Sequence, residues 1–502
     1  MYRHTWRFTM KKTFLTCICI IFGLLISQCE KIGQNPNPPG TTIRLTAISP
    51  AERVSHAPAF MLTANGVNFK TDSVILFNGI KQETTFISSA QLRCRIQPGQ
   101  IIFSTLHVKS EDLPIKVRTP SANNHETDSL PFVLHDNHKF NTTVNIYDST
   151  YDSRYPSAVI AGDGNIHVVW QDHVPGSHEI YYSSSLANGE SWKAPRSLSG
   201  QGDFRAPNLA IDKEGNLFVV FYDNNNDARN IYIRRSTDIG TTWSTAQNLS
   251  HTLRGSFDPV ITVGEPGRLY VAWIDDTPGQ RTIVFTRSAD YGDTWEQMRI
   301  ISNMHGVANY AAICVDSMEN VYLVWFQENE NDFSLFFSHS MDKGDTWTTP
   351  LQLTPLATPL CRSDIAVDSG GIVHIVFDDI QSYSRKIYHM RSRDRGITWE
   401  PRQNISVSPG EDNWMPILVL DGADNLNVAW IGTAARGEML YYSRSIDAGI
   451  RFGFADTNPG FQVDTDIAAV VDTKGDLHVV GGMYIQTENK IKLYYANSGT
   501  TR

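Results

Sequence analysis

The chain has 502 residues, which is enough for two to four domains or one large repeat architecture. Hydrophobic residues make up 41% and charged residues 19%, an ordinary globular composition that excludes wholesale disorder. The net charge of −10 argues against nucleic-acid binding, which needs clustered Lys and Arg, and the aromatic content of 11% favours β-structure over helical bundles.

Residues 1–28 have the pattern of a secretory signal. Four basic residues precede an apolar run from Phe14 to Ile26 that is short for a transmembrane helix. The run ends in Leu-Ile-Ser-Gln-Cys29, which resembles a bacterial lipobox. The resemblance implies that Cys29 is lipidated and becomes the mature N-terminus, anchored in the bacterial cell envelope at the outer membrane or cell surface. A plainly secreted protein and a retained membrane anchor are the alternatives.

The cysteines beyond the leader predict neither a disulfide framework nor a metal site. Only Cys94, Cys314 and Cys361 remain after Cys29; they are odd in number, far apart and without metal-ligand spacing. We therefore interpret them as small buried apolar residues. Residues 29–42 contain several prolines and little apolar content, which is typical of a flexible tether.

Residues 43–135 show short alternating strands separated by turn signals, as in residues 60–64 and 73–77. Glycines 66 and 79 suit tight hairpin turns. The order Ile-Ser-Pro50, Asn-Gly-Val-Asn-Phe69, Phe-Asn-Gly79 and Thr-Thr-Phe86 resembles the IPT/TIG immunoglobulin-like domain. The resemblance implies a small β-sandwich that serves as a spacer or docking module.

From residue 154 onward the chain repeats the unit Ser-x-Asp-x-Gly-x-Thr-Trp. Its glycines stand at 189, 240, 292, 344, 396 and 449, so successive copies are 51, 52, 52, 52 and 53 residues apart. The Asp accepts backbone N–H bonds within its own turn, the Gly tolerates positive φ, and the Trp packs the turn onto the core. We interpret the following residues as this structural device: Asp238, Asp290, Asp342, Asp394 and Asp447. The unit is identified as the Asp-box of the BNR-repeat β-propellers, a family that includes the sialidases.

Four strand patterns recur around each copy, for example at residues 208–211, 217–221, 230–233 and 246–249, which is typical of a propeller blade. Seven inner-strand starts align, and the seventh blade lacks its fourth strand. Residues 143–147 are a spare strand that we expect to complete it and to close the ring. The sequence thus predicts an all-β chain, with the Ig-like sandwich before a seven-bladed Asp-box propeller over residues 137–502.

A functional residue should lie on the top face, where inner strands start and second strands end, and should break the repeat. The second strands mostly end in Asp, including Asp172 and Asp223, and we favour turn capping over a ligand role for these. A ring of carboxylates also suits calcium or sugar hydroxyls. Beyond this calcium option, no metal and no cofactor are expected.

Arginines and aromatic residues on the same face are the candidate ligand contacts. Arg154 and Arg205 occupy equivalent inner-strand starts and Arg362 lies one residue out of register; arginine makes bidentate pairs with carboxylates. The alternative is that they pair with Asp172 or Asp223. Trp414 is placed to stack on a sugar ring, with rim packing as the alternative, and Tyr222 lies on the same face. A repeated strand position holds three histidines that we interpret as packing: His167, His374 and His478.

The resemblance to sialidases implies three arginines around a substrate carboxylate and a tyrosine nucleophile. Phe204-Arg-Ala-Pro207 is similar to their Phe-Arg-Ile-Pro motif. However, that Pro recurs in other blades, sialidases have six blades, and the sequence shows no Tyr–Glu pair. We therefore expect no release of sialic acid.

The expected function is an envelope-anchored propeller that binds glycans or cell-surface proteins through its top face. The alternatives are a glycoside hydrolase, either exo-sialidase-like or polysaccharide-degrading, and a structural or adhesion component. Whether the protein is an enzyme is left open at this point. The expected partners are a glycan or a surface protein, and the membrane through the lipid.

Overall fold

The structure is a computed structural model that describes residues 42–50, 52–54, 60–96, 110–122, 124–135, 143–186, 189–225, 229–252, 255–276, 279–302, 306–329, 332–356, 362–381, 384–406, 412–434, 437–453, 456–457, 463 and 466–498. The predicted signal peptide, Cys29, almost all of the predicted tether and Cys361 lie outside these residues. Among the described residues, no helix has the length and apolar character that a membrane crossing requires.

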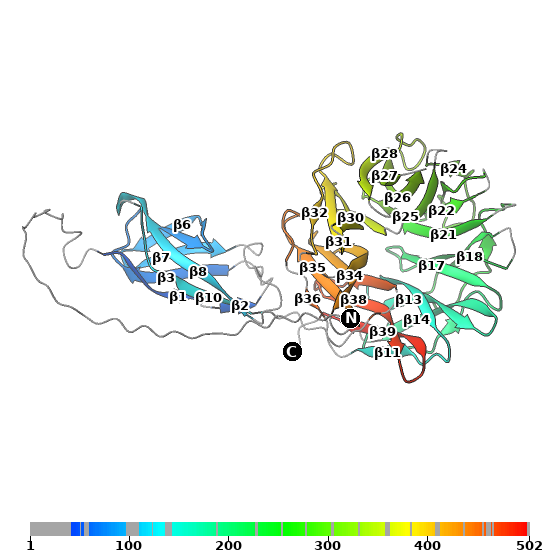
Figure 1. Ribbon diagram of the computed structural model, residues 1–502, viewed down its shortest axis with the longest axis horizontal. Coiled ribbons are helices and arrows are strands. Elements are labelled where there is room, and N and C mark those ends of the chain that lie inside the picture. The colour runs from blue at the N-terminus through cyan, green and yellow to red at the C-terminus, as the bar shows by residue number, and fades with distance from the viewer. Residues whose placement is uncertain are drawn as a thin grey trace, which may run out of the picture.

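The N-terminal domain consists of two sheets (Figure 1). One has the order β1 (Arg44–Ser49), β3 (Phe60–Val67), β7 (Gln91–Ile96), β6 (Thr84–Ser88). The other has the order β2 (Glu52–Val54), β10 (Leu130–His135), β8 (Ser110–Thr119), β4 (Val74–Phe77), β5 (Ile80–Lys81), with β9 (His125–Glu126) on β8. A short 3₁₀ turn, Pro120–Ala122, follows β8.

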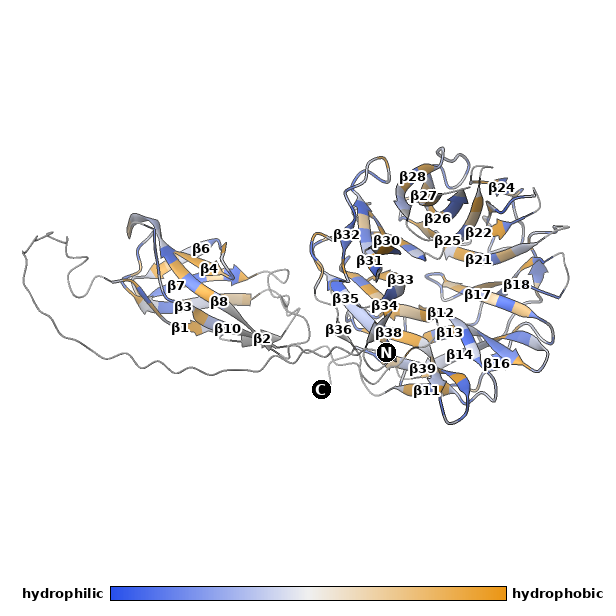
Figure 2. Ribbon diagram, viewed as in Figure 1, coloured by the Kyte–Doolittle hydropathy of each residue, from blue (hydrophilic) through white to orange (hydrophobic). Residues whose placement is uncertain are grey.

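Alternation builds the core of this domain. Buried and exposed residues take turns along β7, and the apolar ones pack on one face against Leu62, Ile75 and Val117 (Figure 2). The predicted Ig-like β-sandwich is confirmed, and Cys94 lies buried in its core.

Seven further sheets follow within the described residues, and Figure 1 shows them arranged around a common centre. We number them as blades 1 to 7. Each lists its strands from the centre outward: β12 (Ser153–Ile160), β13 (Ile166–Val174), β14 (Ser177–Leu186) and β15 (Ser191–Trp192) with β16 (Arg196–Ser197); β17 (Phe204–Ile211), β18 (Leu217–Asp223), β19 (Ile231–Ser236), β20 (Gln247–Asn248); β21 (Ser256–Val263), β22 (Leu269–Asp275), β23 (Thr282–Ser288), β24 (Arg299–Ile300); β25 (Val307–Val315), β26 (Val321–Asn329), β27 (Asp332–Ser340), β28 (Leu351–Leu356); β29 (Ser363–Val367), β30 (Val373–Gln381), β31 (Ser384–Ser392), β32 (Gln403–Asn404); β33 (Asn413–Leu420), β34 (Leu426–Ala434), β35 (Gly437–Ser445), β36 (Asp456–Thr457); β37 (Ile467–Val471), β38 (Leu477–Ile485), β39 (Lys490–Asn497), β11 (Val144–Tyr147). The predicted all-β propeller architecture is confirmed.

The last of these sheets joins the two ends of the propeller. β11 pairs antiparallel with β39, with Val144 opposite Tyr495 and Tyr147 opposite Leu493. Ile146 of β11 is buried between the blades. The spare strand predicted at residues 143–147 therefore lies in blade 7, beside the last strand of the chain.

The second strand of each blade is covered on both faces by its neighbours. β18 and β22 are buried almost throughout, and the indole rings of four equivalent tryptophans are fully buried: Trp170, Trp273, Trp325 and Trp430. Such near-continuous apolar runs are typical of strands that lie between two packed layers.

The Asp-boxes hold the turn between the third and fourth strands. Asp238 accepts the backbone N–H of Thr242 at 2.7 Å and the hydroxyls of Thr242 and Ser236, while Ser236 accepts the N–H of Gly240. The same pattern recurs at Asp290, Asp342 and Asp394, and at Asp447 with an arginine in place of the threonine.

The aromatic residue of each box contacts the preceding blade. Trp399 meets Phe337 edge-on with ring centroids 5.0 Å apart, and Trp243 meets Tyr182 at 5.2 Å. Phe452, the worn copy, meets His389 at 4.9 Å. The sequence predicts that the ring packs its turn onto the core; the structure shows that it also joins neighbouring blades.

Candidate functional site

A β-bulge marks the start of the inner strand in five blades. The register of β12 shifts between Arg154 and Ser157, and the same shift recurs in β17, β21, β25 and β33. One residue in each bulge has a positive φ between 45° and 54°: Tyr155, Ala206, Asp258, Tyr310 and Met415. A bulge re-aims a side chain, and non-glycine residues adopt this conformation only where the surrounding structure imposes it.

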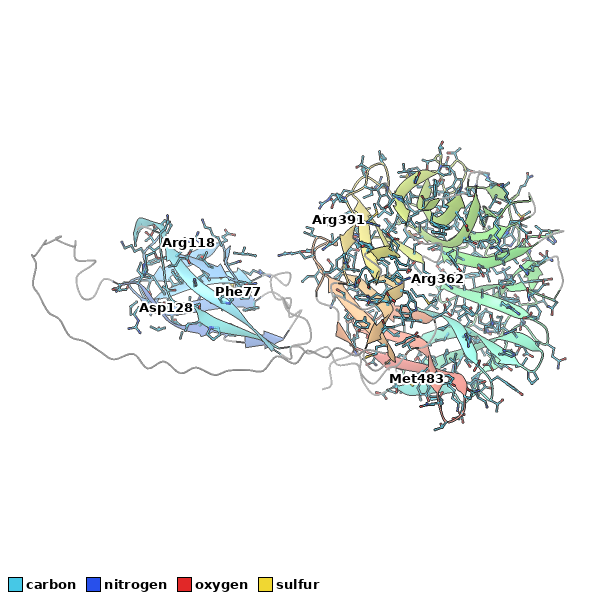
Figure 3. The ribbon with its side chains drawn as sticks, viewed as in Figure 1. Phe77, Arg118, Asp128, Arg362, Arg391 and Met483 are labelled. Carbon is cyan, nitrogen blue, oxygen red and sulfur yellow. The ribbon has the colours of Figure 1, made fainter. Side chains whose placement is uncertain are left out.

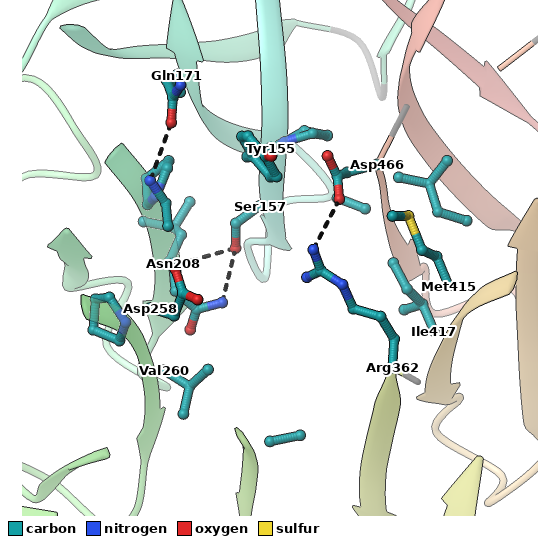
Figure 4. A pocket seen from close by; sticks show the side chains of 18 of the residues that line it. Tyr155, Ser157, Gln171, Asn208, Asp258, Val260, Arg362, Met415, Ile417 and Asp466 are labelled. Atoms are coloured by element: carbon teal, nitrogen blue, oxygen red, sulfur yellow. Dashed lines mark hydrogen bonds and ion pairs between the residues drawn. The ribbon is translucent and has the colours of Figure 1, made fainter. Parts of the chain in front are cut away.

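The repeat places Arg362 and Asp466 at the equivalent position of blades 5 and 7. Arg362 is 52 residues after Tyr310, and Asp466 is 51 residues after Met415. All seven bulge-position residues line one pocket of about 770 Å³ at the centre of the propeller. We call it the axial pocket (Figure 4).

Arg362 crosses the axial pocket between a carboxylate and an aromatic ring. Its Nη2 lies 3.6 Å from Oδ1 of Asp466, and its guanidinium lies 4.7 Å from the centroid of the Tyr310 ring. The backbone N–H of Arg362 donates to Oδ1 of Asp378 at 2.8 Å, which fixes the start of the strand. Figure 3 shows Arg362 near the middle of the ring of blades.

Two carboxylates and a phenol share the pocket with Arg362. Burial raises the pKa of Asp258, against the opposing charges of Arg362, Arg281 and Arg229. Burial also raises the pKa of Asp466, which Arg362 opposes. Burial likewise raises the pKa of Tyr155, so its hydroxyl stays protonated at neutral pH.

A hydrogen-bonded network on Asp203 joins blades 1 and 2 at the rim of the same pocket. Asp203 receives His178 Nδ1 at 2.8 Å, both Nε and Nη2 of Arg205 at 2.8 Å, and Asn224 at 2.7 Å. Burial acts to raise the pKa of Asp203, but these donors lower it to about 2. The network therefore fixes the side chains of His178 and Arg205 at the pocket wall.

The three predicted arginines all reach the axial pocket, and each is paired. Arg154 lies 3.6 Å from Asp152, Arg205 is bound by Asp203, and Arg362 faces Asp466. None of these partners is Asp172 or Asp223, the pairing that the sequence offered as the alternative. Tyr222 also lines the axial pocket, and burial raises its pKa to about 12.

Trp414 lines a second pocket of about 480 Å³ beside the axial one. The two pockets share Tyr310, Arg362 and Met415, so they are continuous across Arg362. Asp378, Arg385 and Asp412 complete the wall around Trp414. We call this the Trp414 pocket.

The structure does not bring Asp172 and Asp223 to either pocket. Asp172 is 1% exposed and accepts hydroxyl bonds from Ser149 and Ser153. Asp223 is also buried and accepts the N–H of Asn230 at 3.3 Å. Throughout the part of the chain that the structure describes, no group of three His, Cys, Asp or Glu side chains is arranged to hold a metal ion.

The three histidines interpreted as packing are buried within the blades. His167 bonds Tyr182 at 2.7 Å, His478 bonds Tyr495 at 2.6 Å, and His374 bonds His389 at 3.2 Å.

Residue-by-residue reasoning from the sequence missed four residues of the pocket: Tyr155, Asp258, Tyr310 and Asp466. They stand one residue after the inner-strand starts that the alignment singled out. The signal was present, since this position reads Tyr, Ala, Asp, Tyr, Arg, Met and Asp through the seven blades and follows no repeat.

Family models match both domains. Residues 44–133 match the IPT/TIG domain and residues 169–375 match the BNR repeat-like domain. The chain joins an IPT/TIG domain to a BNR propeller. A search of curated proteins finds no match.

Solved structures share the propeller fold at low sequence identity. The polysaccharide lyase Uly1 is 10% identical, with a TM-score of 0.51 over 72% of this chain and 100% of that chain. An α-L-arabinanase of Penicillium chrysogenum, complexed with arabinobiose, is 16% identical, with a TM-score of 0.45 over 72% and 98%. The Hadza microbial sialidase Hz136 is 12% identical, with a TM-score of 0.45 over 92% and 98%. Identities this low show the fold alone.

Proposed function

We propose that the BNR propeller binds a glycan in the axial pocket, and that the glycan extends into the Trp414 pocket. The observation that carries this proposal is the set of three arginine–aspartate pairs around a pocket of about 770 Å³. Each pair presents donors beside acceptors, which matches neighbouring sugar hydroxyls, and flat aromatic faces cover the apolar side of a sugar ring. A glycan ligand agrees with the polysaccharide lyase that shares the fold.

The pairing of the arginines favours a neutral glycan over a sialic acid. A ligand carboxylate would compete with Asp203 for both donors of Arg205, and with Asp152 and Asp466 for the other two arginines. Asp258 and Asp466 also repel an anion inside the pocket. This agrees with the expectation that the protein releases no sialic acid.

The continuity of the two pockets favours an oligosaccharide. A ligand that fills the axial pocket meets Arg362, and the next sugar lies over Met415 towards the indole of Trp414. Stacking on an exposed aromatic ring contributes binding free energy without demanding a particular sugar.

The test is an array of neutral and acidic oligosaccharides probed with the full chain, followed by calorimetry on each glycan that binds. Arg362→Ala and Trp414→Ala should each weaken binding about tenfold or more, since each loses a direct contact worth ~1.4 kcal/mol or more. Arg393→Ala is the control, because Arg393 is an exposed residue within an Asp-box. Absence of any glycan ligand, or equal affinity of all three variants, contradicts the proposal.

We also propose that the propeller is held at the bacterial cell envelope by a lipid on Cys29. The support is the sequence pattern that ends at Cys29, which resembles a lipobox. Cys29→Ser should abolish lipid labelling and release the protein from membranes. Unchanged labelling and fractionation would refute the anchor.

A further inference from the structure

Asp258 and Asp466 face the axial pocket from different sides of the ring. Asp258 belongs to the bulge of blade 3, and Asp466 precedes β37 of blade 7. In Figure 4 they stand on different sides of the pocket, with Arg362 reaching towards Asp466. Two carboxylates on either side of a sugar-sized cavity is the arrangement used to hydrolyse glycosidic bonds.

The two carboxylates have different environments. Asp466 faces the guanidinium of Arg362 at 3.6 Å, which stabilises its ionised form. Within the described residues, no side chain or backbone group donates a hydrogen bond to the Asp258 carboxylate, which is the arrangement that favours a protonated acid.

We propose that the axial pocket hydrolyses a glycosidic bond of a neutral glycan, with Asp258 as proton donor and Asp466 as the base that activates water. This inference rests on the proposed glycan binding. The Asp258 proton passes to the glycosidic oxygen as the bond from that oxygen to the anomeric carbon breaks. A water oxygen forms the new bond to the anomeric carbon, and Asp466 takes up the proton that this water loses. Exchange with solvent then returns one proton to Asp258 and removes one from Asp466.

The charges around the pair support this division of roles. Burial raises the pKa of Asp258, which Asp466 raises further and which Arg362, Arg281 and Arg229 lower. Two nearby carboxylates rarely ionise together, so a proton is retained by the one without a partner. The neighbouring phenols of Tyr155 and Tyr222 have raised pKa values and stay neutral, so the reaction falls to the carboxylates.

The test uses the full chain on a panel of 4-nitrophenyl glycosides and neutral polysaccharides, with glycan binding measured in parallel. Asp258→Asn and Asp466→Asn should each lower polysaccharide turnover by about 100-fold or more. Asp258→Asn should retain most turnover of the 4-nitrophenyl glycoside and lose the basic limb of the pH profile, because nitrophenolate departs without a proton. Asp293→Asn, an exposed control, should match the native protein.

Each other outcome overturns the inference. Bound glycans that are never cleaved refute hydrolysis while the proposed binding stands, and a protein that neither binds nor cleaves refutes both. Hydrolysis that survives both substitutions in folded variants, as judged by melting temperature, removes the carboxylates from the reaction.

Discussion

Asp378 connects the interior of blade 5 with the residue that crosses the axial pocket. Its Oδ1 accepts the backbone N–H of Arg362 at 2.8 Å, and its Oδ2 lies 3.5 Å from Nε of Arg385. The side chain is 1% exposed, and burial raises its pKa to about 7 against the opposing bond and charges of Arg362 and Arg385. The charged form is therefore disfavoured in the folded protein.

We expect Asp378→Asn to stabilise the propeller in a pH-dependent way. The unfolded carboxyl loses its proton near pH 4 and the folded one near pH 7, so native stability falls as the pH rises between these values. The amide keeps the acceptor for Arg362 without this cost. The gain in free energy of unfolding should be near zero at pH 4 and level off above pH 7, at no more than about 4 kcal/mol given ~1.4 kcal/mol per pH unit.

Melting curves from pH 4 to pH 9 measure this gain, with Asp293→Asn as an exposed control. A gain of the same size at pH 5 and pH 8 would show that something other than the buried charge is responsible.

Sequence reasoning reached part of the pocket and missed the rest for a geometric reason. Arg154, Arg205 and Tyr222 were placed on the correct face because the repeat identifies strand ends. Asp258 and Asp466 were missed because simple alternation assigns them to the strand scaffold, whereas a bulge turns Asp258 into the axis. The bond between His178 and Asp203 joins two blades, and no spacing within one repeat predicts it.

At the scale of the element, the Asp-box glycines do more than permit a turn. Gly396 has a φ of 94°, and a Cβ built there would lie 2.4 Å from the ring of Phe337 in the preceding blade. Gly240, Gly344 and Gly449 meet an aromatic ring of the preceding blade in the same way. The repeat predicts the turn conformation, but the sequence alone does not show that a neighbouring blade fills the space of the missing side chain.

Gly396→Ala should therefore destabilise the propeller more than a change of backbone freedom alone explains. The left-handed conformation and the overlap with Phe337 each cost on the order of 1–3 kcal/mol. Gly422→Ala is the matched control, since a Cβ there meets nothing within 4 Å. Equal denaturant midpoints for the two variants would contradict this account of the contact between blades.

At the scale of the whole molecule, the repeat predicts the architecture well because each blade must bury its faces against its neighbours. The strand at residues 143–147 was found in the same way, as the missing fourth strand of the last blade. The pockets could not be predicted equally well, since they depend on how seven blades converge and not on any one of them.

A protein that begins at residue 153 should melt well below one that begins at residue 137. The shorter chain lacks β11, exposes the edge of β39 and removes Ile146 from the contact between blades 7 and 1. Differential scanning calorimetry of the two chains makes the comparison. If the melting temperatures agree within error, β11 contributes nothing to closure.

The position of β11 also bears on how the propeller responds to force. Any tension transmitted through the chain ahead of Thr143 reaches the propeller at β11, where the paired residues are Val144, Asn145 and Tyr147. Blade 7 would then yield first, and the ring would open at a defined seam while the other six blades kept their strands. Mechanical strength is thus set by the shortest ladder in the circuit, although thermal strength is shared by all seven blades.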